Sequence, residues 1–446
     1  MIKSHRILLG CSLLAFSLSS CKKDEEQTLP NASPDASVYS ADVATQWNQL
    51  ETRLIKTTNG FVPPVAARAL GYSNLAAYEA VSPGIEGKRS LDEVMNYSYT
   101  LPYANITKKY NWALVSNAAY FQSIKALFVN TSTANIIVID SLYLSFRASL
   151  GANETEEVIK RSESYGAEVA DVIYNWSNSD NGYQAYNNLY PTSYTTPTGL
   201  GMWEPTPPAF QSIPLLPYWG NNRPFLAANV GSACLPPPPL PYSTESTSAF
   251  YQEVLEVYTV SQNLTQDQRD IAVFWADGAN TFTPPGHLMN ITTQLIKEDN
   301  FNLNTAAEIY LRMGLAVNDA FIACWKAKYT HSLLRPVSFI QRNIDASWTP
   351  LVTTPPFPEY TSGHSSVSGA SSEVLTYFFG NHRNFTDNSN TEFGYPARSF
   401  SNFYQAAEEA ANSRLYGGIH YRSGNEKGIN CGKQIGKNIV RLSLNK

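Results

Sequence analysis

Serine, glycine and histidine stand side by side at Ser362-Gly363-His364, within the segment PPFPEYTSGHSSVSGA. This trio places a hydroxyl group, an unshielded backbone N–H and an imidazole on consecutive residues. Residues 365–379 have the pattern of a helix, so the trio is expected at a helix N-terminus. Free amide groups and the positive end of the helix dipole make such a position suitable for binding an anion. Taken alone, the pattern also fits an ordinary helix cap.

Basic residues flank this trio on both sides. Upstream, KYTHSLLRP holds Lys328 and Arg335 seven positions apart, about two helical turns, so the two cations are expected on the same side. Downstream, SRLYGGIH holds Arg414 at the end of a helical pattern and His420 after a pair of glycines. If the fold brings them together, three cations, a helix N-terminus and two histidines would enclose a tetrahedral oxyanion.

The order and spacing of these motifs resemble the three-part signature of the type-2 phosphatidic acid phosphatase and vanadium haloperoxidase superfamily. Features outside the signature favour the haloperoxidase branch: Trp325 and Phe357 lie where fungal-type chloroperoxidases carry aromatic residues, and FWADGANTFTPPGH at 274–287 resembles a haloperoxidase segment. By this resemblance, Asp277 would pair with the arginine of the third motif. The similarity is tight over residues 260–441, looser before them, and strongest to the vanadium iodoperoxidases of marine flavobacteria.

The resemblance implies vanadate as the cofactor and assigns a role to each motif residue. The vanadate oxygens would be bound by three cations, a hydroxyl group and an amide: Lys328, Arg335, Arg414, Ser362 and Gly363. His420 would be the protein ligand of vanadium, His364 the acid–base for hydrogen peroxide, and Lys328 the group that polarises the peroxide. The implied reaction is oxidation of iodide, and more weakly of bromide, to hypohalous acid, which small organic acceptors then consume.

Two other functions remain open. In an acid phosphatase of the same superfamily, His420 would attack phosphorus and His364 would protonate the leaving oxygen. Gly424 occupies the position where the family usually has an aspartate that orients this histidine, which disfavours a nucleophilic His420 and predicts weaker vanadate retention or lost activity. In a different class, a surface lipoprotein rich in tyrosine and tryptophan could bind glycans through its aromatic side chains.

The first residues indicate export. MIKSHRILLGCSLLAFSLSSC, residues 1–21, has the pattern of a bacterial lipoprotein signal peptide, with Cys21 as the lipidated residue and Cys11 as a poorer alternative. The charged KKDEE that follows resembles a surface-export signal. We therefore expect residues 22–38 to form a flexible tether, and the protein to be anchored in the outer membrane facing the cell surface, or alternatively the periplasm.

Composition excludes one class of function and limits the role of the cysteines. A charged content of 15% and a net charge of −5 exclude a nucleic-acid binder held by a basic surface. Cys234, Cys324 and Cys431 are widely spaced, which favours three buried side chains over a zinc site or a disulfide framework.

Helical periodicity predicts an all-α fold made of two bundles joined by a long irregular segment rich in proline and tyrosine. The N-terminal bundle is expected at 39–178, the irregular cover segment at 179–245, and the C-terminal bundle with the vanadate site at 246–446. Helices are expected at 41–57, 63–81, 108–129, 134–149, 155–176, 246–260, 265–276, 285–299, 304–333, 365–379, 402–416 and 425–441. We expect no sheet.

Overall fold

The computed structural model describes residues 33–95, 97–278 and 280–446. The fold contains 59% helix and 3% strand, which confirms the all-α prediction. The predicted signal peptide, the lipidation site Cys21 and residues 22–32 of the predicted tether lie outside the described residues. Residues 33–38, assigned to the tether, are partly packed on the domain: Ala36 and Ser33 are buried, whereas Val38 is 65% exposed.

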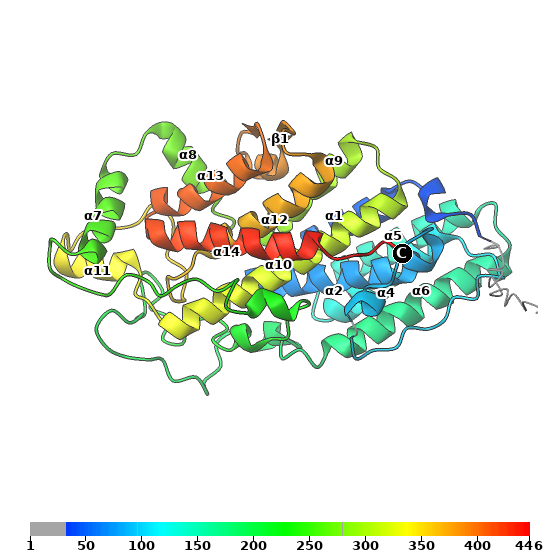
Figure 1. Cartoon of the computed structure of the whole chain (residues 1–446), viewed down its shortest axis with the longest axis horizontal. Coiled ribbons are helices and arrows are strands. Elements are labelled where there is room, and N and C mark those ends of the chain that lie inside the picture. Colours follow the sequence, from blue (N-terminus) through cyan, green and yellow to red (C-terminus); the bar gives the residue numbers. More distant parts are fainter. Residues whose placement is uncertain (1–32, 96, 279) are drawn as a thin grey trace, which may run out of the picture.

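The N-terminal half forms one end of the molecule in Figure 1. Its helices are α1 (Asp42–Thr57), α2 (Pro63–Val81), α3 (Leu91–Met95), α4 (Trp112–Leu127), α5 (Thr133–Gly151) and α6 (Glu156–Ser177). Their first residues carry recognisable start signals. Asn111, Ser132 and Thr155 each accept a backbone N–H of the first helical turn through their side chains.

The C-terminal half contains the longer series of elements. Its helices are α7 (Ala249–Gln262), α8 (Gln266–Phe274), α9 (Thr283–Glu298), α10 (Leu303–His331), α11 (Pro336–Asn343), α12 (Gly363–Phe379), α13 (Phe403–Tyr416) and α14 (Arg422–Val440). Two short strands, β1 (Phe385–Asp387) and β2 (Arg398–Phe400), pair antiparallel with Phe385 opposite Phe400. This hairpin, α3 and α11 were not predicted.

Single helical turns complete the secondary structure. They are the 3₁₀ helices η1 (Ala36–Val38), η2 (Ser82–Gly84), η3 (Ala185–Asn187), η4 (Trp219–Asn221), η5 (Ala227–Val230) and η6 (Ser389–Phe393). Among the described helices, none is both long and apolar enough to cross a membrane.

Helix α10 joins the two predicted bundles, crossing between them in Figure 1. It packs against α2 on one side and α12 on another. Its contact with α2 is close at Gly314, where a Cβ atom would lie 2.8 Å from the backbone oxygen of Leu70. One hydrophobic core runs from Ala36 to Leu444 through both halves. The two predicted bundles therefore share a core.

The segment 179–245 has no helix beyond the short turns η3, η4 and η5, and it lies against the C-terminal half. Trp203 donates its backbone N–H to the oxygen of Ser332 at 2.6 Å, and Leu215 donates to Pro356 at 2.8 Å. These bonds attach the segment to the end of α10 and to the loop before α12. Other contacts attach it to the N-terminal half, among them the ion pair between Arg68 and Asp180 at 2.7 Å.

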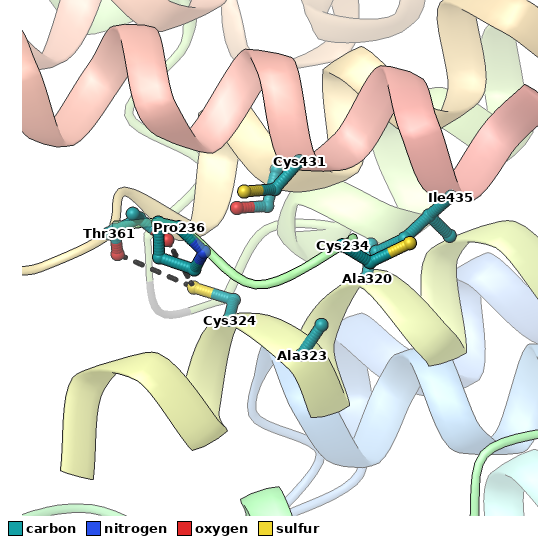
Figure 2. Close-up of a pocket in the computed structure, with 9 residues that line it drawn as sticks. Cys234, Pro236, Ala320, Ala323, Cys324, Thr361, Cys431 and Ile435 are labelled. Atoms are coloured by element: carbon teal, nitrogen blue, oxygen red, sulfur yellow. Dashed lines mark hydrogen bonds between the residues drawn. The ribbon is translucent and has the colours of Figure 1, made fainter. Parts of the chain in front are cut away.

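The three cysteines among the described residues are free thiols; Cys234 and Cys324 are buried as predicted, whereas Cys431 is only partly buried. Figure 2 shows them lining one pocket together with Thr361. The Cys324 thiol donates to the backbone oxygen of Thr361 at 3.4 Å. Cys324 thus packs against the loop that carries the Ser-Gly-His trio, whereas the Cys234 sulfur accepts a hydrogen bond from Asn438 at 3.5 Å.

Candidate active site

The structure brings the three sequence motifs together at the ends of five helices. Lys328 lies in the last turn of α10, Arg335 immediately precedes α11, and Ser362 caps α12. Arg414 lies in the last turn of α13, and His420 follows in the turn before α14. Contacts across the motifs confirm the assembly. The Nη1 atom of Arg335 lies 3.1 Å from Nε2 of His420, and Nη1 of Arg414 lies 2.9 Å from Nε2 of His364.

Local sequence explains why the side chains are held at these positions. Pro336 at the first position of α11 keeps Arg335 extended, as a residue before proline prefers. The Ser362 hydroxyl accepts the N–H of Ser365 at 3.3 Å, which fixes the start of α12. Gly363 is the first residue of that helix, and N–H groups there have no intrahelical acceptor.

The three cations are buried without a matching carboxylate. Lys328 and Arg335 are 0% exposed and Arg414 is 1% exposed. Burial lowers the pKa of Lys328 to about 7 and the pKa of each arginine to about 10. Among the described residues, no aspartate or glutamate forms an ion pair within 4.0 Å of any of the three. Positive charge gathered in this way favours binding of an anion.

Several donors of the cations have no partner in the protein. Lys328 Nζ donates to the backbone oxygens of Pro358 and Glu359 at 2.9 and 2.8 Å. Arg335 Nη2 and the Nε and Nη2 atoms of Arg414 are buried and unbonded among the described residues. Each unsatisfied buried donor costs about 1–3 kcal/mol. An oxyanion with several oxygens would satisfy these donors together.

Both histidines of the site are neutral. Burial, followed by the charges of Arg335 and Lys328, holds the pKa of His420 well below its usual range. Burial and Arg414 do the same to the pKa of His364. His420 is 2% exposed, whereas His364 is only partly buried. A neutral imidazole nitrogen is a common metal ligand and can also accept a proton.

Sequence reasoning missed Glu359, the carboxylate that contacts His420. Its Oε1 lies 2.7 Å from His420 Nδ1 and accepts the backbone N–H of Tyr421 at 3.0 Å. Burial raises the pKa of Glu359 to about 7, against the charges of Lys328 and Arg335. The expectation that His420 lacks an orienting carboxylate, drawn from Gly424, is therefore wrong. The available signal was an acidic residue in the otherwise uncharged stretch PPFPEYTSG.

Two aromatic rings form a wall beside the cations, at the positions expected from the resemblance. The ring centroids of Trp325 and Phe357 are 5.0 Å apart. The Phe357 ring lies 5.0 Å from Lys328 Nζ and 4.8 Å from Arg335 Cζ. These contacts place cations over an aromatic face.

Asp277 forms no ion pair with Arg414 among the described residues, although its charge opposes the lowering of the Arg414 pKa by burial. Its carboxylate lies 2.9 Å from Nδ1 of His287, whose Nε2 lies 2.8 Å from Asp387. Arg414 instead donates from Nη1 to the backbone oxygen of Trp275 at 2.9 Å. Burial opposes protonation of His287, but the two carboxylates raise its pKa to about 10. His287 and Asp387 carry no local spacing signal that sequence reasoning could use.

Comparison with solved structures decides the family. The chain is similar to a crystal structure described as the first bacterial vanadium-dependent iodoperoxidase, with a TM-score of 0.83 and 36% identity. The match covers 92% of this chain and 98% of that one. The chain belongs to the vanadium haloperoxidase family. A family model for the second helical-bundle domain of VCPO also matches residues 308–445.

More distant relatives agree with this family. The vanadium chloroperoxidase of Curvularia inaequalis is 25% identical over 403 residues, which cover 76% of this chain. They span 66% of that protein, just under two thirds of its length. A holo bacterial vanadium-dependent chloroperoxidase shares the fold with a TM-score of 0.67 and 17% identity, over 87% of this chain and 93% of that one.

These vanadium haloperoxidase relatives imply a vanadate cofactor. The site fits such a group on three counts. It holds buried positive charge, unbonded guanidinium donors on Arg335 and Arg414, and a neutral histidine backed by Glu359. Phosphate has the same shape and similar charge, so the donor set alone does not separate the two anions.

Proposed function

We propose that this chain is a vanadate-dependent haloperoxidase that uses hydrogen peroxide to oxidise iodide, and bromide more weakly, to hypohalous acid. The observation that carries the proposal is the set of unbonded, buried guanidinium donors on Arg335, which contacts Nε2 of His420, and on Arg414, which contacts His364. The 36% identity to a protein described as an iodoperoxidase supports the chemistry and the choice of halide.

The three buried cations and the start of α12 form a site that we call the cage. Their hydrogen-bond donors would hold vanadate. His420 would bind vanadium through Nε2, because Nδ1 is engaged by Glu359. The oxygens would be bound by the cations and the start of α12: Lys328, Arg335, Arg414, Ser362 and Gly363. Once bound, vanadate would supply Lewis-acid activation of peroxide without changing its oxidation state.

His364 is the proposed acid–base. It is neutral, because burial and Arg414 hold its pKa well below the usual range, so it can accept a proton from incoming hydrogen peroxide. It is also only partly buried, which suits a group that exchanges protons with solvent. Returning that proton helps to balance the reaction, in which halide, hydrogen peroxide and one proton give hypohalous acid and water.

Lys328 would polarise the peroxide oxygen that the halide attacks. Its side chain is fully buried beside Phe357. A bound anion favours its charged form against the effect of burial, and low polarity strengthens the interaction of that charge with developing negative charge. Iodide is the easiest of these halides to oxidise and chloride requires the most strongly polarised peroxide. Oxidation of iodide, and next of bromide, therefore requires the least polarisation of the peroxide by the site. Small organic molecules would accept the oxidised halogen.

An acid phosphatase remains the second candidate. The bond between Glu359 and His420 at 2.7 Å would support a nucleophilic histidine as well as a coordinating one. The glycine at position 424 argued against phosphatase activity because it left His420 without a carboxylate partner. The bond to Glu359 removes that argument. The functional assay must therefore test both reactions.

The decisive experiment uses protein lacking residues 1–21, stripped of metal and phosphate. Triiodide formation from iodide and hydrogen peroxide is measured with and without orthovanadate. We expect turnover that requires vanadate and that excess phosphate suppresses. No turnover, together with hydrolysis of a phosphate monoester that vanadate inhibits, would replace the proposal with a phosphatase.

We also propose that the protein is an exported lipoprotein anchored in the outer membrane through Cys21. The support is the sequence LSSC and the charged residues after it. Metabolic labelling with a radioactive fatty acid should mark the full-length protein and not Cys21→Ala. Equal labelling of both proteins would contradict the anchor, and surface proteolysis of intact cells would distinguish an outward from a periplasmic orientation.

A further inference from the structure

The carboxylate that contacts His420 comes from an unexpected part of the chain. Glu359 precedes the Ser-Gly-His trio, whereas position 424, in the third motif, holds a glycine. We propose that Glu359 is the positioning residue that fixes the tautomer and orientation of His420 for vanadate binding, and that Gly424 is the vacated position that makes room for it. This inference rests on the proposed function, because its effect is measured as vanadate affinity.

Hydrogen bonds hold the Oε1 atom of the Glu359 carboxylate, whereas Oε2 is buried and unbonded among the described residues. Its Oε1 contacts His420 Nδ1 at 2.7 Å and accepts the N–H of Tyr421 at 3.0 Å. The backbone of Glu359 is fixed as well, since its N–H donates to Leu333 at 2.9 Å and its oxygen accepts Lys328 Nζ at 2.8 Å. Glu359 is 0% exposed, so water does not compete for these bonds.

The geometry specifies which nitrogen of His420 carries the proton. Because a guanidinium N–H can only donate, the contact of Arg335 Nη1 with Nε2 of His420 makes Nε2 an acceptor, and the proton of His420 lies on Nδ1, which donates to Oε1 of Glu359. The lone pair is then on Nε2, which faces Arg335 Nη1 at 3.1 Å. This tautomer directs the metal-binding nitrogen into the cage of cations.

Gly424 and Glu359 compete for the same space. A Cβ atom at position 424 would lie 2.4 Å from Oε1 and 3.0 Å from Oε2 of Glu359. In an aspartate, Cβ and a carboxylate oxygen are themselves roughly 2.4 Å apart, as ordinary bond lengths require. An aspartate at 424 is therefore long enough for one of its oxygens to reach the present position of Oε1. The Glu359 carboxylate, as it now lies, leaves no room for a Cβ atom at position 424.

A double-mutant cycle on the apo-protein tests whether a carboxylate at position 424 can replace that of Glu359. Orthovanadate affinity is measured by calorimetry for the wild type, Glu359→Ala, Gly424→Asp, and the double variant, with circular dichroism as the check of folding. We expect Glu359→Ala to weaken binding by about 10- to 100-fold, the usual effect of losing such a partner. Gly424→Asp should also weaken it, because two carboxylates then crowd one site. The double variant should recover most of the affinity.

Glu253→Ala is the matched control. Glu253 accepts the backbone N–H of Ser423 at 2.7 Å, so it supports the same turn without touching His420. We expect its vanadate affinity to equal that of the wild type. A loss as large as that of Glu359→Ala would assign the effect to the turn and overturn the positioning role.

The remaining outcomes separate this inference from the proposed function. A wild type that binds no vanadate contradicts the proposed function. A wild type that binds, with Glu359→Ala binding equally well, overturns the inference alone. A folded double variant that does not regain vanadate affinity would show that a carboxylate at position 424 cannot replace Glu359, which overturns that part of the inference.

The tautomer can be read in protein with Glu359 and Gly424 intact, even if the variants at those two positions fail to fold. The chain has only six histidines, so ¹⁵N spectra of histidine-labelled apo-protein can be assigned by substituting each in turn. We expect His420 to be protonated on Nδ1. Protonation on Nε2 would overturn the proposal.

Discussion

Arg414 donates from Nη1 to the backbone oxygen of Trp275 at 2.9 Å, across 139 residues of sequence. The Trp275 ring in turn stacks on the imidazole of His287, with centroids 4.7 Å apart. His287 is held between the carboxylates of Asp277 and Asp387. Arg414 of the cage is therefore held by Trp275, which packs on a buried ionic cluster. Loss of that cluster should change the position of Arg414.

The first prediction concerns the pH dependence of this cluster. The pKa of His287 is raised to about 10 by Asp277 and Asp387, against the effect of burial. Because the folded value exceeds the ordinary value of about 6.5, its contribution to the free energy of unfolding is complete below pH 6.5. That contribution is lost as the pH rises towards 10. Thermal unfolding of the wild type and His287→Gln should show a gap in Tm that shrinks over this range.

The exposed His382 provides the control, because it belongs to no such cluster. His382→Gln should follow the wild-type Tm at every pH between 6 and 10. A constant gap between the wild type and His287→Gln across that range would contradict a charged His287.

The second prediction concerns the arginine fork at the cage. Arg335→Lys keeps the positive charge but removes the fork, of which Nη2 is unbonded among the described residues. A charge-assisted hydrogen bond contributes about 1.5–3 kcal/mol, so vanadate affinity should fall by roughly 10- to 150-fold. Arg342→Lys, whose side chain is 52% exposed beside Glu204, should bind vanadate like the wild type. Unchanged affinity in Arg335→Lys would remove this residue from the site.

The third prediction tests the vanadium ligand directly. His420→Ala should lose vanadate-dependent iodide oxidation and measurable vanadate binding, because it removes the ring nitrogen that contacts Arg335 Nη1. The fold should persist, since the Tyr421 N–H still bonds Glu359, with a modest fall in Tm. Full activity in this variant would contradict the ligand assignment, and His382→Ala should behave like the wild type throughout.

Most of the helices were predictable because their signals are local. The expected helix at 304–333 corresponds to α10, Leu303–His331, and the expected 63–81 coincides with α2. Apolar periodicity and capping residues suffice for such elements. The β1–β2 hairpin was missed because strands of three residues are too short for alternation. Its stability comes instead from burial of Phe385 and Phe400.

The site residues likewise fall into two groups: those that local sequence identifies and those that only the tertiary structure shows. The Ser362-Gly363-His364 trio and the flanking cations were identified because each motif is compact in sequence. Glu359 and Asp387 were missed because their roles arise only when the chain brings them to His420 and His287. Asp277 was identified but given the wrong partner for the same reason. Spacing alone does not show which of two nearby cations a carboxylate will meet.

The last prediction concerns the turn that carries His420. Gly418 has φ +75°, and a Cβ atom there would lie 3.1 Å from the Trp348 ring and from Pro350. Gly418→Ala should therefore add steric displacement to the cost of a left-handed backbone, about 1–3 kcal/mol, and move His420 away from the cage. Gly394→Ala separates the two effects, because Gly394 has φ +84° and open space around it. It should lower Tm but keep vanadate affinity, whereas Gly418→Ala should lower both; equal affinity in the two variants would show that the turn does not position the histidine.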